Sequence, residues 1–130
     1  MSQVYSISLK FEFLSIECAK DALQRRIAKG REERVNYSLD HYKGDVGLDL
    51  DNVHDLVRLF FGGWDANLRE GLEPGWLHAG FNASYGWEDV MMTAFEDIAP
   101  FLDDGSEIVI DVDEGVDHGV VKDGSAVWLK

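Results

Sequence analysis

The chain has 130 residues, of which 45% are hydrophobic and 28% are charged, as is typical of one globular domain. Two prolines and thirteen glycines exclude a proline-rich linker or a collagen-like repeat, so we treat residues 1–130 as a single domain. Acidic residues outnumber basic ones by 25 to 12, giving a net charge of −13. Because basic side chains bind phosphate backbones and anionic membranes, we expect neither nucleic acid nor a membrane as a partner.

The single cysteine, Cys18, excludes an intrachain disulfide, as is usual in a reducing compartment. Lys10, Glu12 and Glu17 interrupt the N-terminal region, which therefore lacks the apolar stretch of a signal peptide. No window approaches the roughly 18 apolar residues that a membrane-spanning helix needs. These features predict a soluble cytoplasmic protein.

Polar and apolar residues alternate over residues 4–13, which predicts a half-buried strand. Ser15 is a candidate N-cap for the helix that follows, and Gly30 is expected to end that helix in a left-handed conformation. Alternation then predicts two more strands, over residues 34–39 and 46–50.

A second helix is expected to begin at Asp51 or Asn52, and its apolar stripe has the spacing of an amphipathic helix over residues 53–60. Residues 64–70 are expected to add one or two helical turns. The glycines and proline of residues 71–75 predict a loop.

Residues 76–83 are predicted to form a strand, and Ser84 is a candidate cap for the helix that follows, which is expected to end before Pro100. The expected buried stripe of this helix comprises Trp87, Met91, Ala94, Phe95 and Ile98. Hairpin turns are predicted at Asp113-Glu114-Gly115 and Asp123-Gly124. The strands around these turns are expected over residues 108–110, 116–122 and 125–129.

These elements predict an α+β fold, a mainly antiparallel sheet with helices packed on one face. The expected order is βαββ–α–βαβββ, in which a βαββ unit occurs twice. The two units would be pseudo-repeat halves over residues 4–50 and 76–129, joined by a helical connector over residues 51–70. Sequence identity between the halves is negligible, so a true duplication is one of two alternatives.

No motif for nucleophilic, phosphate-binding or metal-dependent catalysis occurs, so we expect no enzyme activity and no cofactor. The carboxylates near Asp51 are explained as helix caps rather than metal ligands. An acidic stretch follows residue 102, and exposed tryptophans are common in protein interfaces. The candidate partner-binding residues are Asp103, Asp104, Glu107, Asp111, Asp113, Glu114, Asp117, Trp64 and Trp76.

A basic cluster in the first third of the chain is the exception to the acidic composition. Its members are Lys20, Arg25, Arg26, Lys29, Arg31 and Arg34. Cations near the C-terminal end of a helix interact favourably with its dipole, which is the simplest explanation. The alternative is a contact with an anion or an acidic partner.

In size and charge the chain resembles the immunity proteins that neutralise bacterial toxins and small phage-encoded inhibitors of nucleic-acid enzymes. This resemblance implies a protein partner with a basic surface, because a negative face complements a basic cleft and speeds encounter. A second hypothesis is a small-molecule binder or enzyme with an aromatic pocket near Trp76, His78 and Trp87. A third is a homo-oligomeric accessory domain joined through a strand edge or the apolar segment Leu59-Phe60-Phe61.

Overall fold

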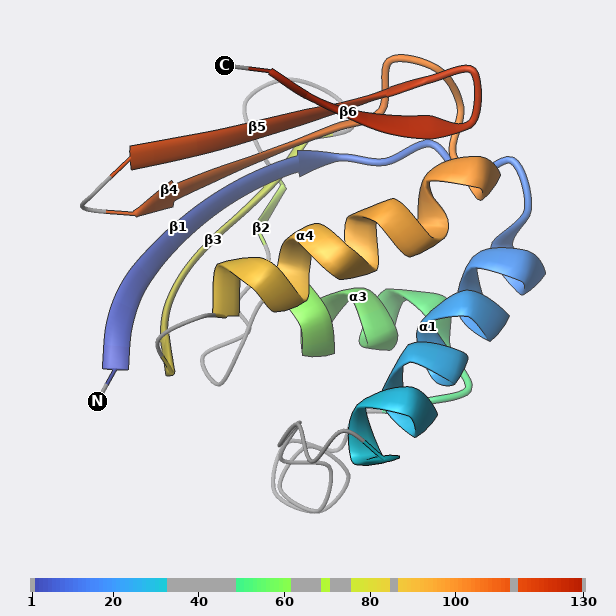
Figure 1. Ribbon diagram of the computed structural model, residues 1–130, viewed down its shortest axis with the longest axis horizontal. Coiled ribbons are helices and arrows are strands. Elements are labelled where there is room, and N and C mark those ends of the chain that lie inside the picture. The colour runs from blue at the N-terminus through green and yellow to red at the C-terminus, as the bar shows by residue number, and fades with distance from the viewer. Residues whose placement is uncertain are drawn as a thin grey trace.

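The computed structural model describes residues 2–32, 49–61, 69–70, 76–84, 87–112 and 115–129. Its elements in chain order are β1 (Ser2–Lys10), α1 (Ile16–Glu32), α3 (Val53–Phe61), β2 (Arg69–Glu70), β3 (Trp76–Ser84), α4 (Trp87–Ile98), the 3-10 helix η1 (Ala99–Phe101), β4 (Glu107–Val112), β5 (Gly115–Lys122) and β6 (Ser125–Leu129). The strands form one antiparallel sheet in the order β2-β3-β1-β4-β5-β6. The helices pack on one face of this sheet (Figure 1), which confirms the predicted α+β class.

Strand β1 is central in the sheet because it pairs with β3 on one side and with β4 on the other. Its alternation is confirmed: Tyr5, Ile7 and Leu9 are buried against the helices. The strand ends at Lys10, earlier than predicted, because the Glu12 amide donates to the hydroxyl oxygen of Ser106 instead of continuing the ladder.

The start of α1 is confirmed, since the Ser15 hydroxyl oxygen accepts the Cys18 amide at 3.2 Å. The prediction that Gly30 ends this helix is wrong. Gly30 is buried within the helix, which continues to Glu32. Glycine lowers helix propensity by about 1 kcal/mol, and tertiary packing commonly overrides a preference of that size.

Asn52 caps α3, as one of the two predicted candidates: its side-chain oxygen accepts the amides of His54 and Asp55 at 2.8 and 3.3 Å. The strand expected over residues 46–50 is wrong at its last two positions. There the Asn52 amide donates to the carbonyl of Asp49 and closes a turn. The rest of that strand and the whole of the 34–39 strand lie outside the described residues, so the duplication stays a prediction.

The helical turns expected over residues 64–70 are wrong at Arg69 and Glu70, which form β2 and pair with β3. Cross-strand pairing with Leu77 and His78, seven to nine residues further along the chain, decides this short segment. Residues 64–68 and 71–75 lie outside the described residues.

The second half of the chain follows the prediction closely, except that Ser84, the candidate cap of α4, is instead the last residue of β3. Met91, Ala94, Phe95 and Ile98 of α4 are fully buried, and Trp87 is half-buried. Strands β4 and β5 pair with Val112 opposite Gly115, whereas residues 113–114 lie outside the described residues. The turn between β5 and β6 is the predicted one: Asp123 and Gly124 have φ angles of 51° and 74°, as a type I′ turn requires.

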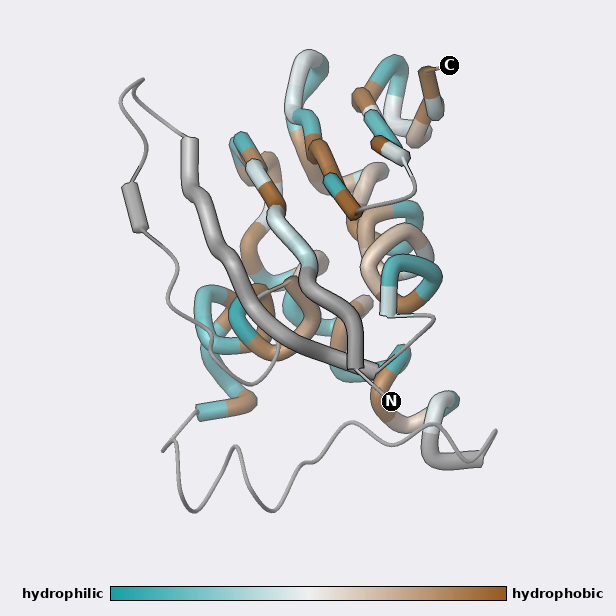
Figure 2. Tube along the Cα trace, turned by 90° about the vertical axis from the view of Figure 1, so that its left-hand side faces the viewer, coloured by the Kyte–Doolittle hydropathy of each residue, from teal (hydrophilic) through white to brown (hydrophobic). Residues whose placement is uncertain are grey.

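One hydrophobic core lies between the sheet and the helices, and hydrophobic residues recur along the described strands and helices (Figure 2). Leu59, Phe60 and Phe61 belong to this core, each with no exposed surface. The idea that this segment is an association surface is therefore wrong, because the stripe of α3 faces the sheet. Within the described part of the chain, no helix has the length and apolar character to cross a membrane.

Candidate functional site

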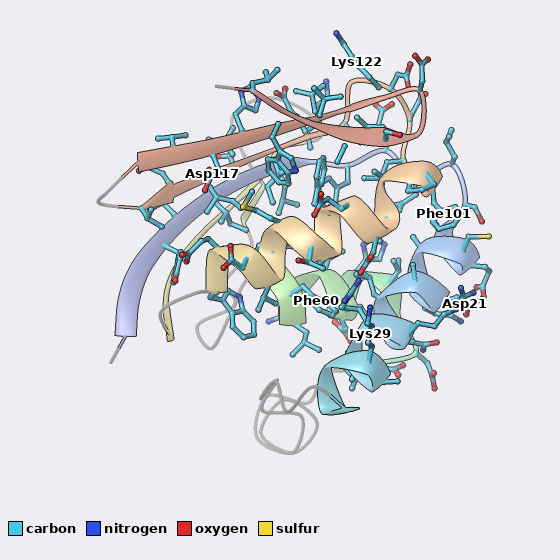
Figure 3. All side chains as sticks on the ribbon, in the orientation of Figure 1. Asp21, Lys29, Phe60, Phe101, Asp117 and Lys122 are labelled. Carbon is cyan, nitrogen blue, oxygen red and sulfur yellow. The ribbon has the colours of Figure 1, made fainter. Side chains whose placement is uncertain are left out.

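The acidic stretch predicted as one contact surface is divided between the two ends of the sheet. Asp103 and Asp104 precede β4, whereas Asp111 lies toward the other end of that strand. Asp117 lies near the same far end, and Figure 3 shows it well away from Lys122 along β5. Asp113 and Glu114 lie outside the described residues.

Asp117 also faces the opposite side of the sheet from Asp111. It is paired with Ile110, which is fully buried under the helices, and residues directly opposite each other share a face. Asp111 is paired with Ser6 and Val116, and all three are exposed on the face without helices. The predicted stretch therefore does not form a single surface.

Four exposed carboxylates come together where β1 ends and β4 begins. This acidic end comprises Glu12, Asp103, Asp104 and Asp123. The Asp103 amide donates to the Glu12 carbonyl at 2.8 Å. The Asp104 carboxylate accepts the Asp123 amide at 3.0 Å, and the Asp103 carboxylate accepts the Asp104 amide at 2.9 Å. Three segments far apart in the chain thus contribute to one negative region.

Ser106 anchors this end of the sheet. It is 2% exposed, and its hydroxyl oxygen accepts the Glu12 amide at 3.1 Å. Its carbonyl accepts the Val121 amide at 2.9 Å, and the Gly105 amide donates to the Val121 carbonyl at 3.1 Å. The backbone carrying the four carboxylates is therefore held on both sides of β4.

Two apolar side chains lie exposed next to the acidic end. Leu14 is 66% exposed and Ile16 is 50% exposed. Leu14 lies two residues after Glu12, and its amide donates to the Phe101 carbonyl at 2.8 Å, which places it alongside the residues that lead into Asp103. The result is an apolar contact bordered by carboxylates, the arrangement of a hydrophobic centre with a charged rim.

The charges nearest the acidic end are not all negative. Lys122 precedes Asp123, and Glu17 at the start of α1 pairs with Lys20 at 3.1 Å. The hydrogen bond from Lys20 to Glu17, and the negative charge of Glu17, raise the pKa of Lys20. Glu17 is therefore partly neutralised, and the acidic end itself supplies the negative potential.

Glu107, another predicted contact residue, is engaged with a histidine. Its carboxylate lies 2.7 Å from Nε2 of His118, and both side chains are half-buried on the face without helices. Lys10 is its partner across the β1–β4 pairing. The contact with His118 occupies one carboxylate oxygen of Glu107 and reduces what this side chain can offer to a basic partner.

The two tryptophans predicted as contact residues lie outside the residues whose side chains the structure describes. Trp64 lies outside the described residues, and Trp76, the first residue of β3, has a described backbone only. The same holds for His78, so the aromatic pocket is not tested. Trp87 has a structural role: its indole N–H donates to the Phe60 carbonyl at 2.9 Å.

Tyr5 of β1 is fully buried and forms a polar contact with the start of α4. Its hydroxyl donates to the Glu88 carboxylate at 2.6 Å and accepts the Trp87 amide at 3.2 Å, which satisfies the start of α4. Burial, together with the hydrogen bond to Glu88 and its negative charge, raises the pKa of Tyr5 to about 12. This contact joins α4 to β1 of the sheet.

Sequence reasoning missed Glu12, Asp123, Leu14 and Ile16. Glu12 lay on the polar face of a predicted strand, and Asp123 lay in a predicted turn. The local structure was therefore sufficient to explain an acidic residue at each position, and neither residue pointed to a binding site. In the described part of the chain, no three histidine, cysteine or acidic side chains are grouped so that they could hold a metal ion. Comparison of the chain with protein-family models, curated proteins and solved structures finds no match.

Proposed function

We propose that this chain is a small acidic protein-binding domain, of the inhibitor or immunity type, that engages a basic partner protein through its acidic end. The observation that carries the proposal is the gathering of Glu12, Asp103, Asp104 and Asp123 next to the exposed Leu14. A negative region with an apolar contact at its border complements a basic surface that carries an apolar pocket.

The two kinds of residue would contribute differently to binding. Rim charges chiefly raise the association rate, because they steer an oppositely charged partner. An apolar anchor buried at the centre of an interface chiefly slows dissociation. Leu14 and Ile16 are the candidate anchors, and the four carboxylates are the steering charges.

The backbone of the acidic end favours binding because it is already ordered. Asp103 and Asp104 lie between hydrogen bonds to Glu12 on one side and Asp123 on the other. Less conformational entropy is lost on association when the contact loop is preorganised.

We place the protein in the cytoplasm. Cys18 is exposed and no second cysteine exists in the chain, so the fold requires no oxidising compartment. An exposed thiol is compatible with a reducing environment.

The test uses affinity capture from native lysate at low and at high salt, with Asp103→Lys/Asp104→Lys compared with wild type. We expect one stoichiometric basic partner, weakened as salt rises because exposed charges are screened. The double reversal should abolish capture. Asp111→Lys/Asp89→Lys is the matched control, since it reverses two exposed carboxylates, one at the other end of β4 and one in the first turn of α4. Equal loss in the control would refute the acidic end as the contact.

With a purified partner, Leu14→Ala separates the apolar contribution from the charges. We expect it to raise the dissociation rate while the salt dependence stays unchanged. An association rate that falls with Leu14→Ala, at an unchanged dissociation rate, would contradict the anchor role.

Self-association is the second candidate function, and one observation favours it. Strand β6 is the last strand of the described sheet order, and it exposes Val127 (37%) and Leu129 (47%) on the face without helices. Exposed strand edges with apolar residues are templates for pairing with a second copy. Sedimentation equilibrium should then show a dimer that Val127→Lys disrupts, and a monomer at high concentration would exclude it.

A further inference from the structure

A hollow of about 280 Å³ lies between α1 and the end of α4. It is lined by Ala22, Arg25, Arg26, Lys29, Asp97, Pro100 and Phe101. Three cations and one carboxylate give this lining a net charge of +2, in a chain whose net charge is −13. Such a concentration of positive charge needs a local explanation.

Arg26 and Asp97 form one wall of the hollow. Nε and Nη2 of Arg26 donate to the two carboxylate oxygens of Asp97 at 2.6 and 2.9 Å. A bidentate pair of this kind has fixed geometry, and its two charges compensate each other.

Arg25 and Lys29 provide the uncompensated charge. Both are exposed, and in the part of the chain that the structure describes neither forms an ion pair with a carboxylate. They are four residues apart on α1, so their side chains lie on the same helix face and can reach a common anion. Arginine and lysine together supply both a planar fork and a compact point charge.

The helix dipole does not account for Arg25 and Arg26. The dipole acts within the last turn, whereas Arg25 lies seven residues before the end of α1 at Glu32. Lys29 is nearer to the end, but Arg25 and Arg26 are too far from it to gain from the dipole. The alternative of an anion contact therefore gains support.

The rest of the lining is apolar. Ala22, Pro100 and the half-buried Phe101 border the cations. A volume near the lower limit for ligand pockets, roughly 300 Å³, suits a small molecule with one charged group and a short carbon part.

We propose that this hollow binds a small phosphate monoester, with the phosphate between Arg25 and Lys29 and the carbon part against Phe101. A phosphate monoester carries about −1.5 to −2 charges at neutral pH, which matches the net charge of the lining. A carboxylate carries half of that charge and would leave one cation unpaired. This site shares no residue with the acidic end, so it goes beyond the proposed protein-binding function.

The test is an NMR titration of the full chain with phenyl phosphate, inorganic phosphate and benzoate at constant ionic strength. We expect saturable shifts of the amides of Arg25, Lys29 and Phe101 with phenyl phosphate. Inorganic phosphate, which lacks the ring, and benzoate, which lacks the second charge, should each bind several-fold more weakly. Benzoate binding as tightly as phenyl phosphate would overturn the assignment of a dianion.

Variants tie the shifts to the site. Arg25→Gln and Lys29→Gln should each weaken phenyl phosphate binding by about tenfold, the loss of one charge-assisted hydrogen bond. Lys20→Gln is the matched control, because Lys20 is on α1 but outside the hollow and should bind as wild type. Circular dichroism verifies that each variant is folded. Unchanged affinity in both hollow variants, or shifts that never saturate, would overturn the proposal.

Discussion

Arg26 on α1 donates two hydrogen bonds to the Asp97 carboxylate on α4, at 2.6 and 2.9 Å. The two side chains are 21% and 25% exposed, so the pair is only partly accessible to solvent. It is a polar link between α1 and α4. Both partners also line the hollow, and their pairing holds Arg26 in a fixed orientation.

Removing one partner of this pair should destabilise the fold. We expect Asp97→Ala to lower the free energy of unfolding by about 2 kcal/mol, because Arg26 loses two charge-assisted hydrogen bonds. Urea denaturation measures the change. Glu96→Ala, at the exposed neighbouring position on α4, is the control and should change little. A double-mutant cycle with Arg26→Ala that shows no coupling would contradict the link.

Stability should fall in alkaline solution because of Tyr5. Burial and the contact with Glu88 raise its pKa from 10.0 to about 12 in the folded chain. Between those pH values the unfolded chain loses the phenolic proton while the folded chain keeps it, so the free energy of unfolding decreases as pH rises. Below pH 10 this contribution is fully present.

Tyr5→Phe isolates that effect. The variant loses the hydrogen bonds to Glu88 and Trp87 and should be about 1 kcal/mol less stable at neutral pH. Chemical denaturation of both proteins from pH 8 to 12 should show the gap between them closing as pH rises. A constant gap across that range would show that the Tyr5 pKa is unshifted.

Gly119 should tolerate no side chain. A Cβ atom there would lie 2.7 Å from Cζ3 of Trp128 and 3.0 Å from Cε2 of Phe95, both ring atoms packed on the inner face of the sheet. We expect Gly119→Ala to cost about 1–3 kcal/mol through overpacking, measured by thermal denaturation. In a Trp128→Leu background the same substitution should cost less. An equal cost in both backgrounds would exclude the clash with Trp128.

Ser106→Ala tests the anchor of the acidic end. The variant removes the acceptor of the Glu12 amide and should cost about 1 kcal/mol in stability. Amide hydrogen exchange at Glu12 should accelerate, and binding to a basic partner should weaken because the contact segment is less ordered. Ser125→Ala, an exposed serine on β6, serves as the control. Unaltered exchange at Glu12 would show that Ser106 does not hold this segment.

Local patterns were sufficient for most of the elements. Apolar residues with a period of two predicted β1, and apolar residues with a period of 3.6 predicted α3 and α4. The spacing is visible in the sequence because each of these elements buries one face. Cap and turn chemistry was equally local: Ser15, Asn52 and the Asp123-Gly124 turn act within a few residues of themselves. The α+β class followed from the order of such elements.

The same patterns were insufficient where strand pairing or tertiary packing decided the outcome. Gly30 has the local signature of a helix end but is buried inside α1. Arg69 and Glu70 extend a predicted helix but pair with β3. An apolar segment such as Leu59-Phe60-Phe61 is compatible with a protein core and with an interface. Only its burial in the tertiary structure shows that it belongs to the core.

The candidate site depended on packing even more strongly. The acidic residues of the stretch 103–117 follow one another closely in the sequence. In the structure, however, strand β4 separates the two ends of the stretch, and successive side chains of a strand point to opposite faces of the sheet. Asp103 and Asp117 therefore cannot share a surface. Glu12 meets Asp103, and Asp123 meets Asp104, only because β1, β4 and β5 pair in one register. Composition is sufficient to give the net charge. Periodicity is sufficient to predict the secondary-structure elements and the fold class, since these depend on residues that are close together in the sequence. Which charges act together depends on strand register, which is set by contacts between residues as far apart as Glu12 and Ser106.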